Sequence, residues 1–137
     1  MDVTDPSYAE GRVLEFESED AIGTDLLQTF PYEGPHQRIF YETREFSAVC
    51  PFNGLPDYAY FSMEYIPDTD IVELKSLKYY IVSFRNVGIF QENATKRLYA
   101  DLYALLKPRF LCVKTVYNTR GGIDATCEIR SDEQGQA

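Results

Sequence analysis

The segment Glu73-Leu-Lys-Ser-Leu-Lys-Tyr-Tyr-Ile-Val-Ser-Phe84 decides the fold, because it ends a run of residues with the pattern of strands and begins one with the pattern of a helix. Its apolar residues recur at the spacing of one helix face, which predicts a helix over 73–86. The same spacing predicts a second helix from Gln91 to just before Pro108. The two apolar stripes are Leu74, Leu77, Ile81 and Phe84, and then Ala94, Leu98, Leu102 and Leu105.

Strands are expected on both sides of this helix pair. Residues 37–46 and 58–66 are rich in aromatic and β-branched side chains, and a third such run, 110–117, follows the second helix. A turn is expected at 118–122, after which residues 123–130 alternate apolar and polar side chains. The order ββααββ predicts an α+β protein with an antiparallel sheet and a helix pair on one face. The other face is expected to be polar or to pack in an oligomer.

Length and composition indicate one domain. The 137 residues are 45% hydrophobic and 15% aromatic, which is enough for a sizeable core. We expect residues 1–25 to form an irregular N-terminal arm, residues 26–130 to form the single domain, and residues 131–137 to be a disordered tail.

Charge and cysteine content narrow the class of protein. Thirteen basic and 22 acidic residues leave a formal net charge of -9, so direct binding of nucleic acid is not expected. No apolar run reaches the length of a membrane span, and the acidic start lacks the features of a signal peptide. Cys50, Cys112 and Cys127 are widely spaced, which fits reduced thiols in a cytoplasmic protein. Cys112 and Cys127 are expected in the core, because they lie on predicted strands.

Cys50 opens the segment Cys50-Pro-Phe-Asn-Gly-Leu-Pro-Asp57, whose Pro, Asn and Gly residues predict a constrained turn. A thiol in such a turn is reachable, whereas a buried cysteine is usually inert. To act as a nucleophile it must become a thiolate, and Lys75 and Lys78 could supply a positive field if the first helix packs beside the turn. Asp57 could donate or accept the proton that nucleophilic addition requires, although a turn former is the ordinary role of Asp in such a segment.

Glu92 has two readings at the start of the second helix. It could complement the helix dipole, or it could accept two hydrogen bonds from the amide and amino edge of a purine-like base. Sequence spacing alone does not distinguish these two roles. His36 is the only histidine and lies in a Gly-Pro loop, so a Ser-His-Asp triad is not expected. The sequence contains no zinc-ligand spacing, Walker loop or Gly-x-Gly-x-x-Gly motif. We therefore predict no metal, and a nucleotide cofactor would bind without a Rossmann fold.

Six short segments carry a resemblance to a known family. They are Gln28-Thr-Phe-Pro31, Phe46-Ser-Ala-Val-Cys-Pro51 with Pro56-Asp57, Tyr65-Ile-Pro-Asp68, Glu73-Leu-Lys-Ser-Leu-Lys-Tyr-Tyr80, Ser83-Phe-Arg-Asn86 and Arg120-Gly-Gly-Ile-Asp124. From about residue 26 to residue 129 the chain resembles the 7-cyano-7-deazaguanine reductases, the NADPH-dependent nitrile reductases of queuosine biosynthesis. The Glu-x-Lys-Ser-x-Lys-x-Tyr segment is specific for this family.

The resemblance implies the tunnelling fold, in which ββααββ units associate into barrels and active sites form between subunits. It implies reduction of the nitrile of 7-cyano-7-deazaguanine (preQ0) to the aminomethyl group of preQ1, with NADPH as cofactor, in tRNA queuosine biosynthesis. The implied partners are this small molecule and other copies of the chain, as a decamer of two pentamers.

By position, the resemblance also implies roles for individual residues. Cys50 would attack the nitrile carbon to form a covalent thioimide, and Asp57 would donate and accept protons. Covalent addition is useful because a nitrile carbon is a poor hydride acceptor, and enclosure would protect the imine that follows from water. Substrate binding would involve Val72, Glu73, Leu74, Gln91 and Glu92, and cofactor binding would involve Lys75, Ser76, Lys78 and Arg120. Arg120 could instead merely close a hairpin through Gly121 and Gly122.

Gln91 stands where the family commonly has histidine. Glutamine can hydrogen-bond a substrate but cannot be protonated as an imidazole can, so we expect a positioning role and no acid role. Three alternatives remain. One is an amidine-forming relative without NADPH, against which the retained Lys75-Ser-Leu-Lys78 argues. Another is a zinc-dependent pterin or GTP enzyme, for which a single histidine is too few. The last is a non-catalytic purine-binding oligomer with an inert Cys50.

Overall fold

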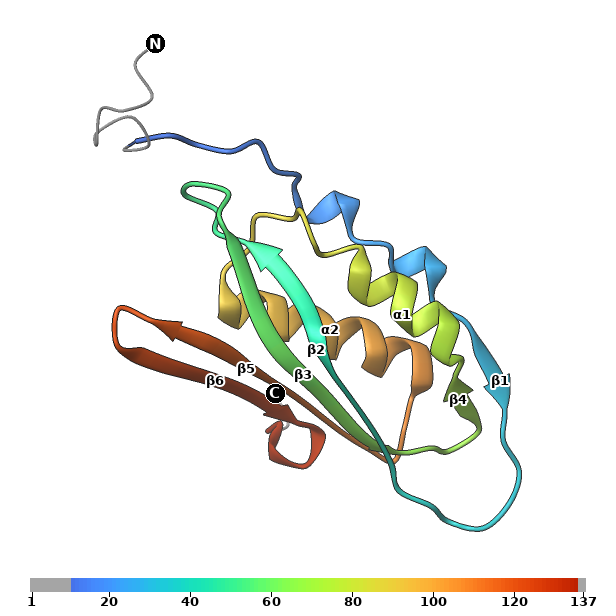
Figure 1. The fold of residues 1–137 in the computed structure, drawn as a ribbon. Helices are drawn as coiled ribbons and strands as arrows, with labels where there is room; N and C mark the ends of the chain where they lie inside the picture. The colour runs from blue at the N-terminus through green and yellow to red at the C-terminus, as the bar shows by residue number, and fades with distance from the viewer. Residues whose placement is uncertain (1–10, 136–137) are drawn as a thin grey trace.

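The structure is a computed structural model that describes residues 11–135. One antiparallel sheet has the strand order β2-β3-β5-β6, formed by Ile39–Val49, Pro56–Ile66, Phe110–Arg120 and Ile123–Arg130. Two helices, α1 (Leu74–Val82) and α2 (Gln91–Leu106), lie together on one face of this sheet (Figure 1). The predicted ββααββ order and the position of the helix pair are confirmed.

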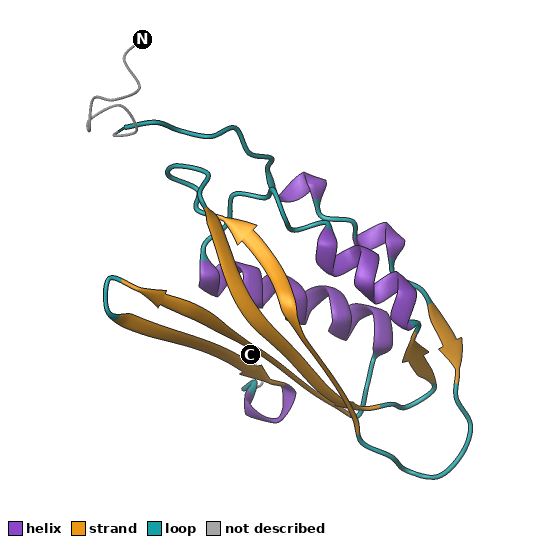
Figure 2. Cartoon of the chain, in the orientation of Figure 1, coloured by secondary structure: helices purple, strands orange, loops and turns teal. Residues whose placement is uncertain are grey.

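A second, smaller sheet was not expected. Strand β1 (Thr29–Pro31) pairs antiparallel with β4 (Asp70–Val72), at the end of the molecule where α1 begins (Figure 2). Each strand has only three residues, which is too short to leave a pattern in the sequence. This pairing of β1 with β4 fixes the position of the chain just before the N-terminus of α1.

The core lies between the helices and the four-stranded sheet. Leu77, Ile81 and Phe84 of the first predicted stripe are buried, but Leu74 is 55% exposed because it lies in the first turn of α1 and borders an open groove beside β2. The second stripe is buried as expected through Leu102, after which α2 buries Leu106 and leaves Leu105 partly buried. A hydrogen bond of 2.7 Å joins the buried hydroxyls of Thr95 on α2 and Thr115 on β5, so the helix position on the sheet is defined by a polar contact as well.

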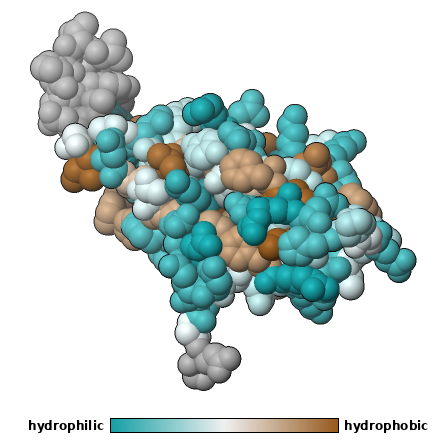
Figure 3. Space-filling model, turned by 90° about the horizontal axis from the view of Figure 1, so that it is seen from below, coloured by the Kyte–Doolittle hydropathy of each residue, from teal (hydrophilic) through white to brown (hydrophobic). Residues whose placement is uncertain are grey.

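The predicted alternation of inward and outward side chains is confirmed from Ala125 onward, but Ile123, next to the turn, is 71% exposed. Ala125, Cys127 and Ile129 lie opposite Tyr117, Thr115 and Val113, on the side that faces α2, and they stay partly exposed because β6 is an edge strand. Cys112 is buried, but it lies on the opposite face of the sheet, where its thiol donates to Glu128 at 3.5 Å. It is therefore not a member of the core under the helices. The face seen from below Figure 1 mixes hydrophilic and hydrophobic areas (Figure 3).

The N-terminal arm is irregular but more ordered than the composition suggested. It contains two 3-10 turns, Glu19–Ala21 and Thr24–Leu26, and it runs along α1. Gly23 N–H of the arm donates to Ser83 Oγ, at the C-cap of α1, at 2.8 Å, and just beyond the arm Gln28 N–H donates to Ser76 Oγ of the helix at 3.0 Å. The part of the predicted arm before residue 11 lies outside the described residues.

The end of the chain also differs from the prediction of a tail disordered from residue 131. Ser131–Glu133 form a 3-10 turn, and Ser131 Oγ accepts a hydrogen bond of 2.9 Å from Leu111 N–H. Arg130 pairs with Asp132, which closes the turn. Residues 136–137 lie outside the described part of the chain.

Candidate active site

Cys50 lies where the sequence placed it, in the turn between β2 and β3. Its N–H donates to Leu55 O at 2.9 Å, and its carbonyl accepts from Gly54 N–H at 2.8 Å, so two hydrogen bonds close the turn around it. Gly54 has φ +73°, a conformation that glycine adopts at little cost. The residue is partly buried at the end of the sheet.

The start of α2 lies beside this turn. Residues 87–89 run alongside the end of β2: Val49 N–H donates to Val87 O at 3.0 Å, and Ile89 N–H donates to Val49 O at 3.1 Å. The next residue, Phe90, stacks edge-on against Phe52 of the turn at 5.5 Å between ring centroids. These contacts bring the first residues of α2, Gln91 and Glu92, to the Cys50 end of the molecule.

Asp57 belongs to β3 rather than to the turn, which corrects the prediction that the turn extends to it. It lies opposite Ala48 of β2, one residue before the end of that strand. It is only 6% exposed, and its carboxylate forms an ion pair with Arg120. Burial raises the pKa of Asp57, and the guanidinium of Arg120 opposes that shift without cancelling it. Such a carboxyl suits an exchange of protons better than an exposed one does.

Arg120 owes its position to the hairpin between β5 and β6. Gly121 and Gly122 have φ values of +56° and +78°, and two positive φ values are typical of the two-residue turns that join twisted strands. The turn is narrower than the expected 118–122, because β5 continues to Arg120. The hairpin role of this segment is confirmed. In the protomer the guanidinium contacts Asp57, a partner that the cofactor prediction did not include.

Tyr117 joins this group, although the sequence did not single it out. It lies on β5 opposite Ala59 and is 4% exposed. Burial raises its pKa, and Asp57, Cys127 and Glu92 raise it further through their charge. A tyrosine on a strand usually packs in a core, so only the spatial neighbours distinguish this one. Asp57, Tyr117 and Arg120 line a small cavity of about 160 Å³.

Residues 72–78 lie elsewhere in the protomer. Val72 N–H donates to the Tyr65 hydroxyl at 3.2 Å, and Tyr65 lies about 26 Å along β3 from Asp57 at a rise of roughly 3.3 Å per residue. The β1–β4 end and the Cys50 turn are accordingly at opposite ends of the sheet in Figure 1. Val72, Glu73 and Leu74 are therefore not beside Cys50 of the same chain, and Lys75 and Lys78 do not flank its thiol.

The signature segment also has a structural role. Glu73 caps α1, because its carboxylate accepts hydrogen bonds from Lys75 N–H at 2.6 Å and Ser76 N–H at 3.0 Å. Ser76 is 4% exposed, and its hydroxyl donates to Glu73 O at 2.7 Å while accepting from Gln28 N–H. The capping of α1 thus accounts for the presence of Glu73 and Ser76 in the segment, whereas the side chains of Lys75 and Lys78 are exposed.

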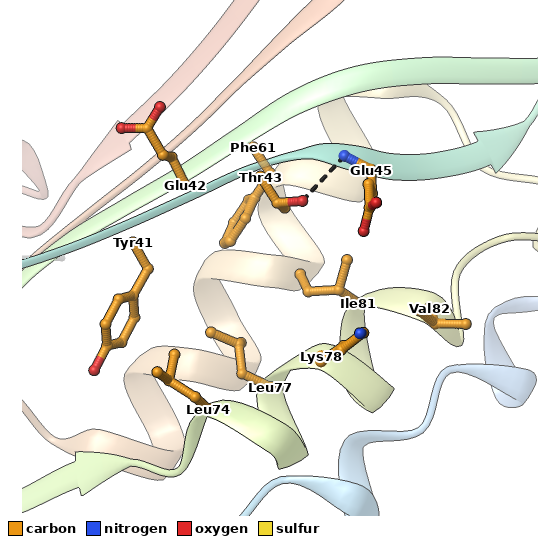
Figure 4. A pocket seen from close by; sticks show the side chains of 10 residues that line it. All are labelled: Tyr41, Glu42, Thr43, Glu45, Phe61, Leu74, Leu77, Lys78, Ile81 and Val82. Atoms are coloured by element: carbon orange, nitrogen blue, oxygen red, sulfur yellow. Dashed lines mark hydrogen bonds between the residues drawn. The ribbon is translucent and has the colours of Figure 1, made fainter.

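A groove of about 250 Å³ lies between α1 and β2 (Figure 4). Leu74, Leu77 and Ile81 of the helix point toward Phe61 and Tyr41 across it. Lys78 borders the groove, but so does Glu45, whereas the carboxylate of Glu42 points away from the helix (Figure 4). An anionic ligand would meet both signs of charge here, so this groove is a poorer candidate for a phosphate than its lysine alone suggests.

Two further properties concern the part of the chain that the structure describes. No helix between residues 11 and 135 is long and apolar enough to cross a membrane. Within the same range, no group of three or more His, Cys, Asp and Glu side chains could hold a metal ion.

Comparison with known proteins agrees with the expected family. The family described as QueF-like protein matches residues 56–136. The chain is 56% identical over 126 residues to the NADPH-dependent 7-cyano-7-deazaguanine reductase of Thermotoga petrophila, covering 91% of this chain and 92% of that protein. It is 47% identical over 116 residues to the enzyme of the same name from Caldicellulosiruptor bescii, covering 83% of this chain and 88% of that protein.

A solved structure supports the fold independently. The crystal structure of the archaeosine synthase QueF-Like in the apo form superimposes with a TM-score of 0.64 and 21% identity, covering 75% of this chain and all of that one. This likeness concerns the fold and confirms the expected tunnelling architecture, while the closer sequence matches specify the family. The chain belongs to the family of NADPH-dependent 7-cyano-7-deazaguanine reductases.

Proposed function

We propose that this protein reduces the nitrile of 7-cyano-7-deazaguanine to an aminomethyl group with NADPH, through a thioimide on Cys50. The observation that carries the proposal is the convergence at one end of the sheet. A partly buried thiol, a buried carboxyl and the start of α2 with Glu92 come together there from three separate segments of the chain. The identity of up to 56% with proteins named for this reaction supports the same assignment.

The first step needs a nucleophile and a proton source. The Cys50 sulfur forms a bond to the nitrile carbon, one π bond of the nitrile breaks, and the nitrogen takes a proton. Asp57 is the candidate donor, because its burial favours the protonated form. Arg120 favours the carboxylate after the proton has left, so the pair can support both states of Asp57.

NADPH, when bound, supplies the hydride for each of the two reductions that convert a nitrile into an amine. The exposed lysines Lys75 and Lys78 lie on one side of the first turns of α1, where their charge fits a phosphate. Ser76 is a weaker candidate, since its hydroxyl is already committed to Glu73 and Gln28. Arg120 is paired with Asp57 through one guanidinium nitrogen, so only its remaining N–H groups are available for the cofactor.

The complete site requires a second copy of the chain. Within one protomer, residues 72–74 and Cys50 lie at opposite ends of the sheet, so the proposed substrate segment can meet the thiol only across a subunit boundary. We propose a homo-oligomer, as the decamer of two pentamers that the family resemblance implies. Sedimentation would test this: an active species at the 15.8 kDa mass of the monomer would refute a shared site.

The proposal includes a cytoplasmic location and a role in queuosine biosynthesis. All three cysteines are free, which suits a reducing compartment. Glu92 is proposed to hold the amide and amino edge of the base, with Gln91 in a positioning role. Glu92→Gln should raise the dissociation constant of 7-cyano-7-deazaguanine at least tenfold, because roughly the binding free energy of one charge-assisted hydrogen bond is lost. Unchanged binding would remove Glu92 from the site.

The decisive experiment follows NADPH absorbance after addition of 7-cyano-7-deazaguanine, together with the intact mass of the protein. Cys50→Ala should abolish both NADPH oxidation and the covalent adduct, whereas Cys127→Ala, a matched control on β6, should keep the adduct. Consumption of two NADPH per substrate by the unmodified protein would support the reductase. An adduct without NADPH oxidation would favour amidine chemistry, and the absence of both would favour a purine-binding oligomer.

A further inference from the structure

Tyr117 differs from the other deeply buried tyrosines in one respect. Tyr65 uses its hydroxyl to accept from Val72 N–H at 3.2 Å, and Tyr80 donates to Asp101 at 2.7 Å. The Tyr117 hydroxyl, in a residue only 4% exposed, has no hydrogen-bond partner within residues 11–135. Buried hydroxyls are almost always paired, so this one points to a partner that the protomer does not itself provide.

The surroundings of the hydroxyl place it at the candidate active site. Tyr117 lies opposite Ala59 of β3 and Ala125 of β6, two small side chains that leave room for its ring. Asp57 is on the same side of β3, two residues before Ala59, and it lines the cavity of about 160 Å³ together with Tyr117. The hydroxyl is thus close to the proposed proton donor.

The charges around Tyr117 determine which hydrogen-bonding role it can play. Burial raises its pKa, and the nearby charges of Asp57, Cys127 and Glu92 raise it further. The phenol therefore keeps its proton at neutral pH and is available as a donor. The ionised carboxylate of Glu92 can only accept hydrogen bonds, and the Arg120 guanidinium is paired with Asp57, so the Tyr117 hydroxyl supplies a neutral donor that neither of these two groups offers.

We infer that the Tyr117 hydroxyl donates a hydrogen bond to the carbonyl oxygen of the bound deazaguanine. This inference rests on the proposed function. The edge of the base presents an amino group, a ring N–H and a carbonyl oxygen in a row, and a carboxylate such as Glu92 can accept only from the first two. A neutral donor beside that carboxylate completes the recognition of the edge. Tyr117 is then a specificity residue that acts in binding and is not a proton carrier.

The test removes the hydroxyl and keeps the ring. Calorimetry would compare the binding of 7-cyano-7-deazaguanine to Cys50→Ala and to Cys50→Ala/Tyr117→Phe, so that no covalent step intervenes. Loss of one neutral hydrogen bond should weaken binding about threefold to tenfold. Tyr103→Phe, which removes an exposed hydroxyl from the far part of α2, is the matched control and should leave binding unchanged.

An analogue identifies the acceptor atom. The thiocarbonyl analogue keeps both N–H donors of the base but presents sulfur, a weaker acceptor, in place of oxygen. The effect of Tyr117→Phe should fall below about twofold with this analogue. With Cys50 intact, Tyr117→Phe should raise KM and leave kcat within about twofold, because the bond is made equally in the ground and transition states. The melting temperature should not fall, since no hydrogen bond within the protomer is lost.

The outcomes separate this inference from the proposed function. Equal affinities of the Phe and Tyr proteins would overturn the role of the hydroxyl, and they would indicate solvent as its partner. An equal loss with both ligands would overturn the carbonyl as the acceptor. Failure of the unmodified protein to oxidise NADPH would refute the reductase alone, because the binding comparison does not depend on turnover.

Discussion

Gly54→Ala should destabilise the protein and loosen the Cys50 turn. Gly54 has φ +73°, and a Cβ there would lie 2.3 Å from the carbonyl oxygen of Leu14 and 3.0 Å from its Cβ. Because the obstacle is backbone, a side-chain rotation cannot relieve the contact. The N-terminal arm would have to move away, and it would lose the 2.9 Å hydrogen bond from Leu14 N–H to Asn53 O.

The expected cost has two parts. A non-glycine residue at positive φ costs roughly 1–2 kcal/mol, and the displaced arm loses about 1 kcal/mol with its hydrogen bond. Gly121→Ala separates them, since Gly121 also has positive φ, +56°, but a Cβ there meets nothing within 4 Å. It should show the backbone cost alone. The excess of about 1 kcal/mol for Gly54→Ala corresponds to a further fall of roughly 3–5 °C in melting temperature.

Thermal unfolding of the two variants and the wild type would measure this difference. The labelling rate of Cys50 by a thiol reagent gives a local readout, and it should rise in Gly54→Ala but not in Gly121→Ala, because Gly54 N–H donates to the Cys50 carbonyl. Equal melting temperatures and equal labelling rates for the two variants would refute the reasoning, since the contact between the arm and the turn would then contribute nothing.

Three further changes test the site and its supports. Arg120→Gln removes the group that opposes the burial-raised pKa of Asp57, so that pKa should rise further. At low pH, where Asp57 is protonated in both folded and unfolded chains, the variant should have the same free energy of unfolding as the wild type. As pH rises through the raised pKa, the variant should lose about 1 kcal/mol of that free energy relative to the wild type. A melting temperature lower by the same amount at every pH would contradict this. Glu73→Ala should cost about 1 kcal/mol through loss of the α1 cap, whereas a melting temperature equal to that of the wild type would mean that the cap contributes nothing. Tyr80→Phe should cost about 1–2 kcal/mol, since it breaks the 2.7 Å bond to Asp101, and urea unfolding would measure it.

The sequence predicted most of the fold because its signals are local. The helical spacing around Leu77 and Ile81, and the alternation around Cys127, each report which face of an element is buried. Turn residues likewise predicted an accessible Cys50 between two strands. Local patterns did not predict the short strands β1 and β4. Each has three residues, and the two strands form because Thr29 and Val72 pair although they are far apart in the chain.

The resemblance in the sequence identified the candidate catalytic residues but not their contacts. It named Cys50 and Asp57, and Arg120 as a cofactor ligand, yet Asp57 and Arg120 meet in the protomer because β3 pairs with β5 in one particular register. The same register brings Tyr117 beside Asp57. Sequence reasoning missed Tyr117, because a tyrosine on a strand has the same local pattern whether its hydroxyl is paired or not.

Periodicity, turn chemistry and motifs act over a few residues, so the sequence by itself determined the two helices and the four long strands, their order, the turn that contains Cys50 and the family. The separation of Cys50 from residues 72–78, the pairing of Asp57 with Arg120 and the unpaired hydroxyl of Tyr117 depend on which strands are neighbours and in what register. Only the tertiary structure decided them, because contacts between residues far apart in the chain follow from packing of the whole sheet.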